Sequence, residues 1–323
     1  MYKILTLILS LTLSVSSFGQ GVILNSSEIE NAKSFLEAYF RPVGSSIGAG
    51  LNNGWYNTAK PHKLAGFDVS LTLNLVSITD ETKFFNVNEL NNFSSLSERT
   101  PTVLGNGEGA TITYDNNEGI SGTFTMPDQD VEITAVPIPT LNVGIGLIKG
   151  TELTIRYIPD YEFDMGFTGK GTIGLYGGGI KHDILQWLPV VDKLPFDLSV
   201  QAAFSQLNTS FEVESQSVKQ EVGLNVNAST YNLILSKKFS VLTAYSSVGV
   251  NNSKSHFVSN TNFRLGSTEV IDFNIPLTLD FEKQSEIQAA LGVRLKLAIF
   301  TLYANQTFSK YPITSAGIGL SFR

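Results

Sequence analysis

Two short motifs in this chain have spacings that catalytic or phosphate-binding sites use. Gly44-Ser-Ser-Ile-Gly48 fits G-x-S-x-G around Ser46, and Gly169-Lys-Gly-Thr-Ile-Gly174 fits G-x-G-x-x-G. A nucleophile elbow needs a strand before the serine and a helix after it, but here a helical pattern precedes Ser46 and a loose loop follows. Phosphate binding needs a helix N-terminus after the glycines, and the residues around Gly169 have a strand pattern. We therefore predict that the chain is not an enzyme and uses no cofactor.

The metal-ligand residue types are sparse. Asp160, Glu162 and Asp164 lie on one side of an extended segment. They either hold a cation such as calcium through their oxygen atoms or form a solvated cluster at the end of a strand, and the sequence leaves both alternatives open. The histidines do not have the spacing of a zinc site. They are His62, His182 and His256.

The elements that would position such residues are long two-faced strands. Apolar residues alternate strictly with small or polar ones from Ile287 to Ile299, and this period of two is typical of a β-strand. A strand of this length is about twice as long as those of most soluble sheets. Arg294 and Lys296 lie on the face without large aliphatic side chains. Both the length and the charges fit a strand with one face in lipid and the other in a wet lumen.

The same alternation recurs along most of the chain, for example from Phe67 to Leu75 and from Leu141 to Leu147. Tight connections and long polar connections both occur between these segments, as in outer-membrane barrels. We predict an all-β fold, an antiparallel transmembrane β-barrel of about 12–14 strands spanning residues 63–323. Two local features are also predicted: a β-bulge around Ser229–Thr230, and a hairpin turn at residues 283–285 that places Asp272 beside Lys296.

The N-terminus predicts export. A short basic stretch is followed by the apolar residues Ile4 to Val15, and Ser17 and Gly19 fit a cleavage site before Gln20. Residues 1–19 are therefore a predicted signal peptide. The chain has no cysteine and a net charge of −7, which argues against a disulfide framework and against binding of nucleic acid. The expected location is the cell outer membrane, with membrane lipid as a partner.

A helix and a glycine-rich stretch precede the first long strand. Ser27 and Glu30 form a capping box, apolar residues follow at helical spacing, and Arg41–Pro42 is expected to end the helix. We predict that residues 20–62 form an N-terminal helix and a plug, or hatch, inside the lumen; a periplasmic tether is the alternative. The residues expected to line a site for an apolar ligand are Phe35, Tyr39, Phe40, Leu51, Trp55 and Tyr56.

Three segments carry a family resemblance. They are residues 50–68, Gly179-Ile-Lys-His-Asp-Ile-Leu-Gln-Trp-Leu-Pro189 and Leu194-Pro-Phe-Asp-Leu198. They resemble a group of uncharacterised Gram-negative outer-membrane proteins, which are similar to the FadL-like transporters of long-chain fatty acids and hydrocarbons. The resemblance implies a hatch-blocked barrel, exit through the wall beside a kinked strand, and barrel-assembly machinery that recognises Phe322. Pro137 and Pro139 are candidates for opening the wall, because proline lacks the N–H that a strand ladder uses; an ordinary strand edge or a bulge is the alternative.

Two functions follow as expectations. The first is passive uptake of hydrophobic small molecules of the fatty-acid or hydrocarbon type. The second is a structural or adhesive barrel that binds an external partner through its loops, above all through Asn86 to Asn117.

Overall fold

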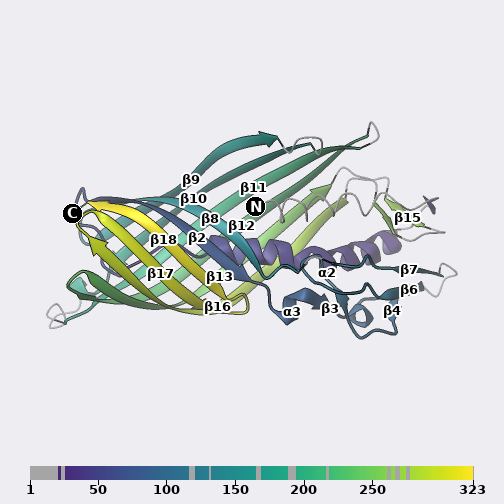
Figure 1. Cartoon of the computed structure of the whole chain (residues 1–323), viewed down its shortest axis with the longest axis horizontal. Coiled ribbons are helices and arrows are strands. Elements are labelled where there is room, and N and C mark those ends of the chain that lie inside the picture. The colour runs from purple at the N-terminus through teal and green to yellow at the C-terminus, as the bar shows by residue number, and fades with distance from the viewer. Residues whose placement is uncertain are drawn as a thin grey trace.

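Ten long antiparallel strands form the wall of a closed barrel (Figure 1). The structure is a computed structural model, and it describes residues 21–22, 26–115, 121–130, 132–164, 169–187, 194–215, 218–259, 263–265, 270–273 and 277–322. The ring closes where β18 pairs with β2, from Phe322 opposite Phe67 to Ile313 opposite Val76. The wall strands are β2 (Phe67–Ser77), β8 (Ala135–Gly146), β9 (Thr151–Asp164), β10 (Lys170–Asp183), β11 (Asp197–Ser215), β12 (Val218–Phe239), β13 (Leu242–Ser259), β16 (Leu277–Leu297), β17 (Phe300–Phe308) and β18 (Ile313–Phe322).

The antiparallel barrel is confirmed, but its ten strands are fewer than the predicted 12–14. The prediction assumed roughly ten residues per strand. Strands β11, β12, β13 and β16 have 19, 22, 18 and 21 residues instead. The described part of residues 78–134, between β2 and β8, also contributes no strand to the wall.

The two faces of the wall are inverted relative to a soluble protein. On β2, the large side chains from Phe67 to Leu75 are exposed on the outer face, whereas Ser70, Thr72 and Asn74 are buried inside. On β16, Leu291 is 61% exposed and Arg294 only 8%. This confirms the predicted orientation of the strand, with aliphatic side chains outward and Arg294 in the lumen.

The predicted hairpin turn at residues 283–285 is wrong. Strand β16 runs through this stretch and pairs with β13, and a register shift between Ser253 and Ser255 takes up the irregularity. Asp272 pairs with Arg264 in a small separate sheet, and Lys296 pairs with Thr301. The polar residues here do not mark a turn, because the strand continues past the apolar outer belt.

The predicted bulge in β12 is also wrong, because its register with β11 and β13 is unbroken. The apolar residues change face instead: Val226 and Ala228 are buried inside, while Tyr231 and Leu233 are exposed outside. Leu279 and Phe281 of β16 are apolar and also point inward. At this end of the barrel the interior holds a helix, so apolar side chains have something to pack against on the inner face.

That helix is α2 (Ser26–Leu51), which packs against β2, β8, β12, β13 and β16 (Figure 1). It continues through Pro42, where the sequence predicted its end; the surrounding strands keep the chain helical although proline removes one hydrogen bond. Gly44 and Gly48 face β13, and a Cβ on either would lie 2.7 or 2.5 Å from the Cβ of Ser255 or Ser253. Only glycine permits this approach. We call residues 26–62 the inner segment.

The two ends of the barrel differ in their connections. At one end, which we call the turn end, tight turns carry positive φ angles at Lys149, Ser240 and Ala298. Phe322, the last residue of β18, lies there too. The connection with the 3-10 turn η4 (Leu185–Trp187) also lies at this end. At the opposite end, the loop end, residues 78–134 form a small lobe over α2 (Figure 1).

We call residues 78–134 the loop lobe. It contains α3 (Asp80–Lys83), β3 (Phe84–Phe85), η2 (Val87–Glu89), β4 (Phe93–Ser95), β5 (Thr100–Pro101), β6 (Thr111–Asp115) and β7 (Ser121–Thr125). A further small sheet at this end joins β1 (Gly21–Val22), β14 (Phe263–Leu265) and β15 (Val270–Phe273). Within the described residues, no helix combines the length and the apolar character needed to cross a bilayer.

Candidate functional site

Arg156 holds the end of the helix inside the barrel. It points inward from β9, is completely buried, and donates hydrogen bonds to the backbone carbonyl oxygen atoms of Leu51 (2.6 Å) and Asn53 (2.8 Å). Its Nε donates to Asn142 at 2.9 Å, and its guanidinium lies 3.9 Å from the centre of the Trp55 ring. Leu51 is the last residue of α2, where carbonyl groups lack helical partners and the dipole is negative. Arg156 therefore caps the helix from the barrel wall.

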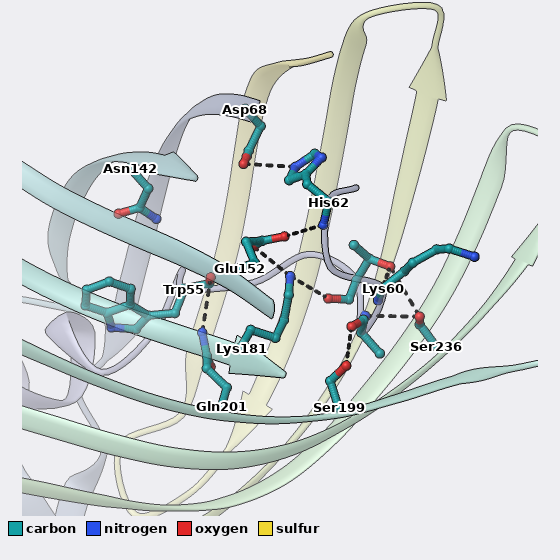
Figure 2. A network of polar contacts seen from close by, with 12 residues as sticks. Trp55, Lys60, His62, Asp68, Asn142, Glu152, Lys181, Ser199, Gln201 and Ser236 are labelled. Atoms are coloured by element: carbon teal, nitrogen blue, oxygen red, sulfur yellow. Dashed lines mark hydrogen bonds and ion pairs between the residues drawn. The ribbon is translucent and has the colours of Figure 1, made fainter. Parts of the chain in front are cut away.

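A second cluster fixes the inner segment where it approaches the turn end (Figure 2). Glu152 and Lys181 form an ion pair at 2.9 Å, with side chains 6% and 4% exposed. Glu152 also accepts from the backbone N–H of His62 at 2.9 Å, and Lys181 donates to the carbonyl oxygen of Thr58 at 3.3 Å. The imidazole of His62 lies 3.1 Å from Asp68 at the start of β2. The charges of the wall are thus compensated by one another and by the backbone of the inner segment.

Little space remains between the inner segment and this part of the wall. The gap lined by Trp55, His62, Asp68, Glu152 and Lys181 measures about 20 Å³, taken as the space open to the centre of a water molecule. That volume holds one or two waters. This part of the lumen is therefore filled, and it has no room for an organic ligand.

The six predicted site residues do not form one pocket. Phe35, Tyr39 and Phe40 pack in an apolar cluster with the loop lobe and the inner faces of β13 and β16. Phe40, for example, stacks on Phe257 with ring centroids 5.3 Å apart. Burial raises the pKa of Tyr39 to about 12, and its hydroxyl accepts from Gln129 at 3.1 Å. These three residues therefore form a structural core between helix and lobe.

The other three predicted residues lie deeper in the barrel. Leu51 is fully buried in a second apolar cluster. Trp55 stacks on Arg156, and Tyr56 hydrogen-bonds Ser247. Of the six residues, Leu51 lies beside the opening described next.

The wall has a seam between β8 and β9. These strands pair only from Asn142 opposite Arg156 to Gly146 opposite Glu152. Among the described residues, the rest of β8 pairs with β2 alone and the rest of β9 with β10 alone. Three prolines lie on the unpaired stretches. They are Pro137 and Pro139 on β8 and Pro159 on β9.

The seam is apolar on its inner side. Ile138 from β8 and Ile158 from β9 both pack against the cluster of Leu51, Leu175 and Leu207. Proline lacks an N–H donor, so it discourages the two free edges from pairing with each other or with another strand. The seam is therefore a lasting discontinuity with an apolar interior behind it.

The chemistry-bearing motifs have plain structural roles. Ser46 lies inside α2 and is fully buried, so no strand-turn-helix elbow surrounds it. Lys170–Gly174 is part of β10, as its strand pattern predicted. Glu162 pairs with Lys170 at 2.8 Å. The part of the chain that the structure describes contains no group of three or more acidic or histidine side chains placed to hold a metal ion.

The central residues Arg156, Glu152 and Lys181 are absent from the predicted site. A signal for Arg156 existed, because it lies on the polar face of a strand whose other face carries Leu153, Ile155 and Tyr157. Because the apolar face of such a strand contacts lipid, this alternation predicts that Arg156 points into the lumen. Its partners are backbone carbonyl groups at the end of a helix distant in sequence. Every residue has such a group, so the residue types do not identify them.

Comparison with known proteins gives a family and a set of distant folds. The profile of the "Family of unknown function (DUF6588)" matches residues 1–322. The comparison with curated protein sequences finds no match. Among solved structures, the autotransporter NalP translocator domain from Neisseria meningitidis has 10% identity, covers 91% of this chain and 99% of its own, and has a TM-score of 0.36.

Two further solved structures span a similar share of the chain. The toluene transporter TbuX of Ralstonia pickettii has 8% identity, coverage of 87% and 97%, and a TM-score of 0.29. The attachment invasion locus protein Ail of Yersinia pestis has 9% identity, coverage of 80% and 98%, and a TM-score of 0.28. The closed barrel and its exposed apolar belt give this chain the fold of an outer-membrane β-barrel.

Proposed function

We propose that this chain, which belongs to the Family of unknown function (DUF6588), is an outer-membrane barrel for passive uptake of hydrophobic small molecules. The inner segment acts as the plug, and the seam between β8 and β9 is the lateral path. The observation that carries this proposal is the seam itself, where two neighbouring strands pair over only five residues. The ligands are of the fatty-acid or hydrocarbon type.

The apolar character of the seam supports this class of ligand. Ile138 and Ile158 flank it, and Leu51, Leu175 and Leu207 lie behind it. A hydrophobic molecule moving through this opening exchanges apolar contacts in the lipid for apolar contacts in the wall. Ile138 and Ile158 offer no side-chain hydrogen bonds to a polar solute, so this level of the seam favours apolar ligands.

The axial route is closed to such molecules. The gap at Trp55 has room for only one or two waters, and its lining is charged or polar. An apolar ligand there would displace hydrogen bonds that it cannot replace. A lateral path avoids this cost, because it leaves the polar half of the lumen undisturbed.

Membrane placement is part of the same proposal. The outward apolar belt fits contact with outer-membrane lipid, and the aromatic residue Phe322 near the chain end fits recognition by barrel-assembly machinery. The predicted signal peptide, residues 1–19, lies outside the described residues. It remains a prediction.

Uptake into liposomes tests the proposal. Ile138→Asp places a carboxylate at the seam, and we expect it to slow the entry of a labelled alkane or fatty acid relative to the unaltered protein. Leu96→Asp makes the same chemical change at a fully exposed site in the loop lobe, and we expect no effect. Uptake by the unaltered protein no faster than by empty liposomes would overturn the proposal, and so would equal rates for the two variants.

A second function, binding of an external partner, is favoured by the charge of the loop lobe. Residues 78–134 contain ten Asp or Glu and two Lys or Arg, a net charge of −8, whereas the whole chain sums to −7. The rest of the chain therefore sums to +1, and nearly all the charge imbalance lies in the lobe. A structural or adhesive barrel with this lobe would bind a basic partner, more weakly as salt increases.

Neutralising the lobe separates the two functions. A variant with Glu98, Glu108, Asp128 and Asp130 changed to the matching amides keeps the shapes of the side chains. If the lobe is adhesive, this variant loses binding to a polylysine-coated surface while its uptake rate is unchanged. Equal binding by both proteins would exclude the adhesive function.

A further inference from the structure

The N-terminal half of the inner segment is anchored at the loop end. Phe35 and Phe40 pack in the cluster formed with the loop lobe and the inner wall. The backbone N–H of Val103 donates to the carbonyl oxygen of Tyr39 at 3.2 Å. Upstream of the helix, Gly21–Val22 pairs in parallel with Val270–Ile271, in the connection between β13 and β16. Gly21–Val22, the described residues before α2, therefore lie at the loop end.

The C-terminal half of the inner segment ends at the turn end. His62 contacts Glu152 near the start of β9 and Asp68 near the start of β2. The next residues bond to the last residue of β8, where the N–H of Ala65 donates to the carbonyl oxygen of Gly146 at 3.0 Å. The chain then enters β2 directly. This end of the segment is fixed by covalent continuity with the wall.

The segment is long enough to pass through the whole apolar belt. Helix α2 has 26 residues, which at 1.5 Å per residue is about 39 Å. The apolar band of an outer-membrane barrel is about 25 Å tall. Helix α2 alone exceeds this height, and the stretch after Leu51 adds to it.

The orientation of the barrel in the membrane follows from the lengths of its connections. In outer-membrane barrels the short turns face the periplasm and the long loops face outward. The start of β2 and the end of β18 both lie at the turn end, because Phe67 pairs with Phe322. The turn end is then periplasmic and the loop end extracellular.

From these observations we infer that the inner segment is a strut anchored on opposite faces of the membrane, and that the chain preceding α2 is displayed on the outer surface of the cell. A plug tied at one end can swing out of its barrel, but a strut held at both ends cannot. Rearrangement of the lumen is thereby limited to shifts within the barrel. This inference does not depend on which molecule the barrel carries.

Labelling of single cysteines tests this topology, and the natural chain has no cysteine to interfere. We expect Val22→Cys to react with a membrane-impermeant maleimide equally in intact and in permeabilised cells. Leu96→Cys in the loop lobe should behave in the same way. Ser240→Cys, in the exposed turn between β12 and β13, should react only after permeabilisation.

The inference would be overturned if Val22→Cys reacts only after permeabilisation while Leu96→Cys already reacts in intact cells. Reaction of Ser240→Cys with protection of both other sites would reverse the orientation and overturn surface display. If Val22→Cys reacts in neither condition, an epitope tag inserted after residue 22 decides: antibody binding to intact cells supports the inference, and binding only after permeabilisation refutes it. Uptake assays read a different property, so the failure of one proposal does not imply the failure of the other.

Discussion

Replacing Arg156 with alanine is expected to loosen the end of the helix without unfolding the barrel. The substitution leaves the carbonyl oxygen atoms of Leu51 and Asn53 without their partner. An unpaired buried acceptor costs about 1–3 kcal/mol, so the two together cost about 2–6 kcal/mol. Loss of the stacking on Trp55 adds about 2 kcal/mol. The variant no longer buries the charged guanidinium, and the absence of this desolvation penalty offsets several kcal/mol of the loss.

The net effect is that the state in which the helix end is held against the wall becomes less stable by about 2–3 kcal/mol. About 1.4 kcal/mol is a factor of ten in an equilibrium constant. The fraction of molecules in which the helix end is detached from the wall should therefore rise roughly 30- to 150-fold. The wall should not respond, because its strands are held by their own ladders of hydrogen bonds. The effect is therefore local.

Native-state hydrogen exchange measures this local opening. We expect amides of residues 48–56 to lose protection by the stated factor, while amides in β11 and β12 keep theirs. Arg156→Lys retains the charge but not the planar fork of donors, and it should give a smaller loss. Lys170→Ala removes a cation from an exposed pair on the next strand and serves as the control without effect.

Two results would refute this reasoning. Unchanged protection of residues 48–56 in Arg156→Ala would show that the hydrogen bonds to the helix end do not hold the segment. An equal loss of protection throughout the wall would show that Arg156 supports the barrel rather than the inner segment. Either outcome would remove its role as a helix cap.

Two further predictions concern the same interior. Gly48→Val places a branched side chain whose Cβ would lie about 2.5 Å from the Cβ of Ser253. Hydrogen exchange of the helix amides should therefore accelerate, and Ser253→Gly in the same chain should partly reverse this. Lys181→Met leaves the buried carboxylate of Glu152 without its cationic partner, which should lower the free energy of unfolding by about 3–5 kcal/mol. Glu152→Gln in the same chain should recover most of the loss in denaturant titrations, and an equal loss in the double variant would contradict this reasoning.

The orientation of most strands was predictable, because the outer face obeys a local rule. Lipid requires an apolar side chain at every second position, so the alternation at Leu71 or Leu291 identifies the outer face without knowledge of the neighbours. The rule fails at Leu279 and Val226. Both are apolar, but they face inward because a helix distant in sequence fills the lumen there.

The continuation of the helix past Pro42 and the partners of Arg156 could not be predicted, for a related reason. Pro42 normally ends a helix, but here helix α2 continues to Leu51 because the wall packs around it. The predicted aromatic residues are buried as expected of a binding site, yet most serve as contacts between helix and lobe or between segment and wall. Arg156 donates to backbone carbonyl oxygen atoms, and no pattern of side chains predicts such a partner.

The pairing of β18 with β2 dictates an order of assembly. These are the last and first strands of the wall, so the ring cannot close until the whole chain has been synthesised and its ends have met. Long-range pairing of this kind is slow, because loop-closure entropy is lost before the contacts form. The inner segment continues into β2 and packs against the inner faces of β12, β13 and β16. If the helix lies on these faces before the ring closes, it gives the curling sheet a surface to wrap around.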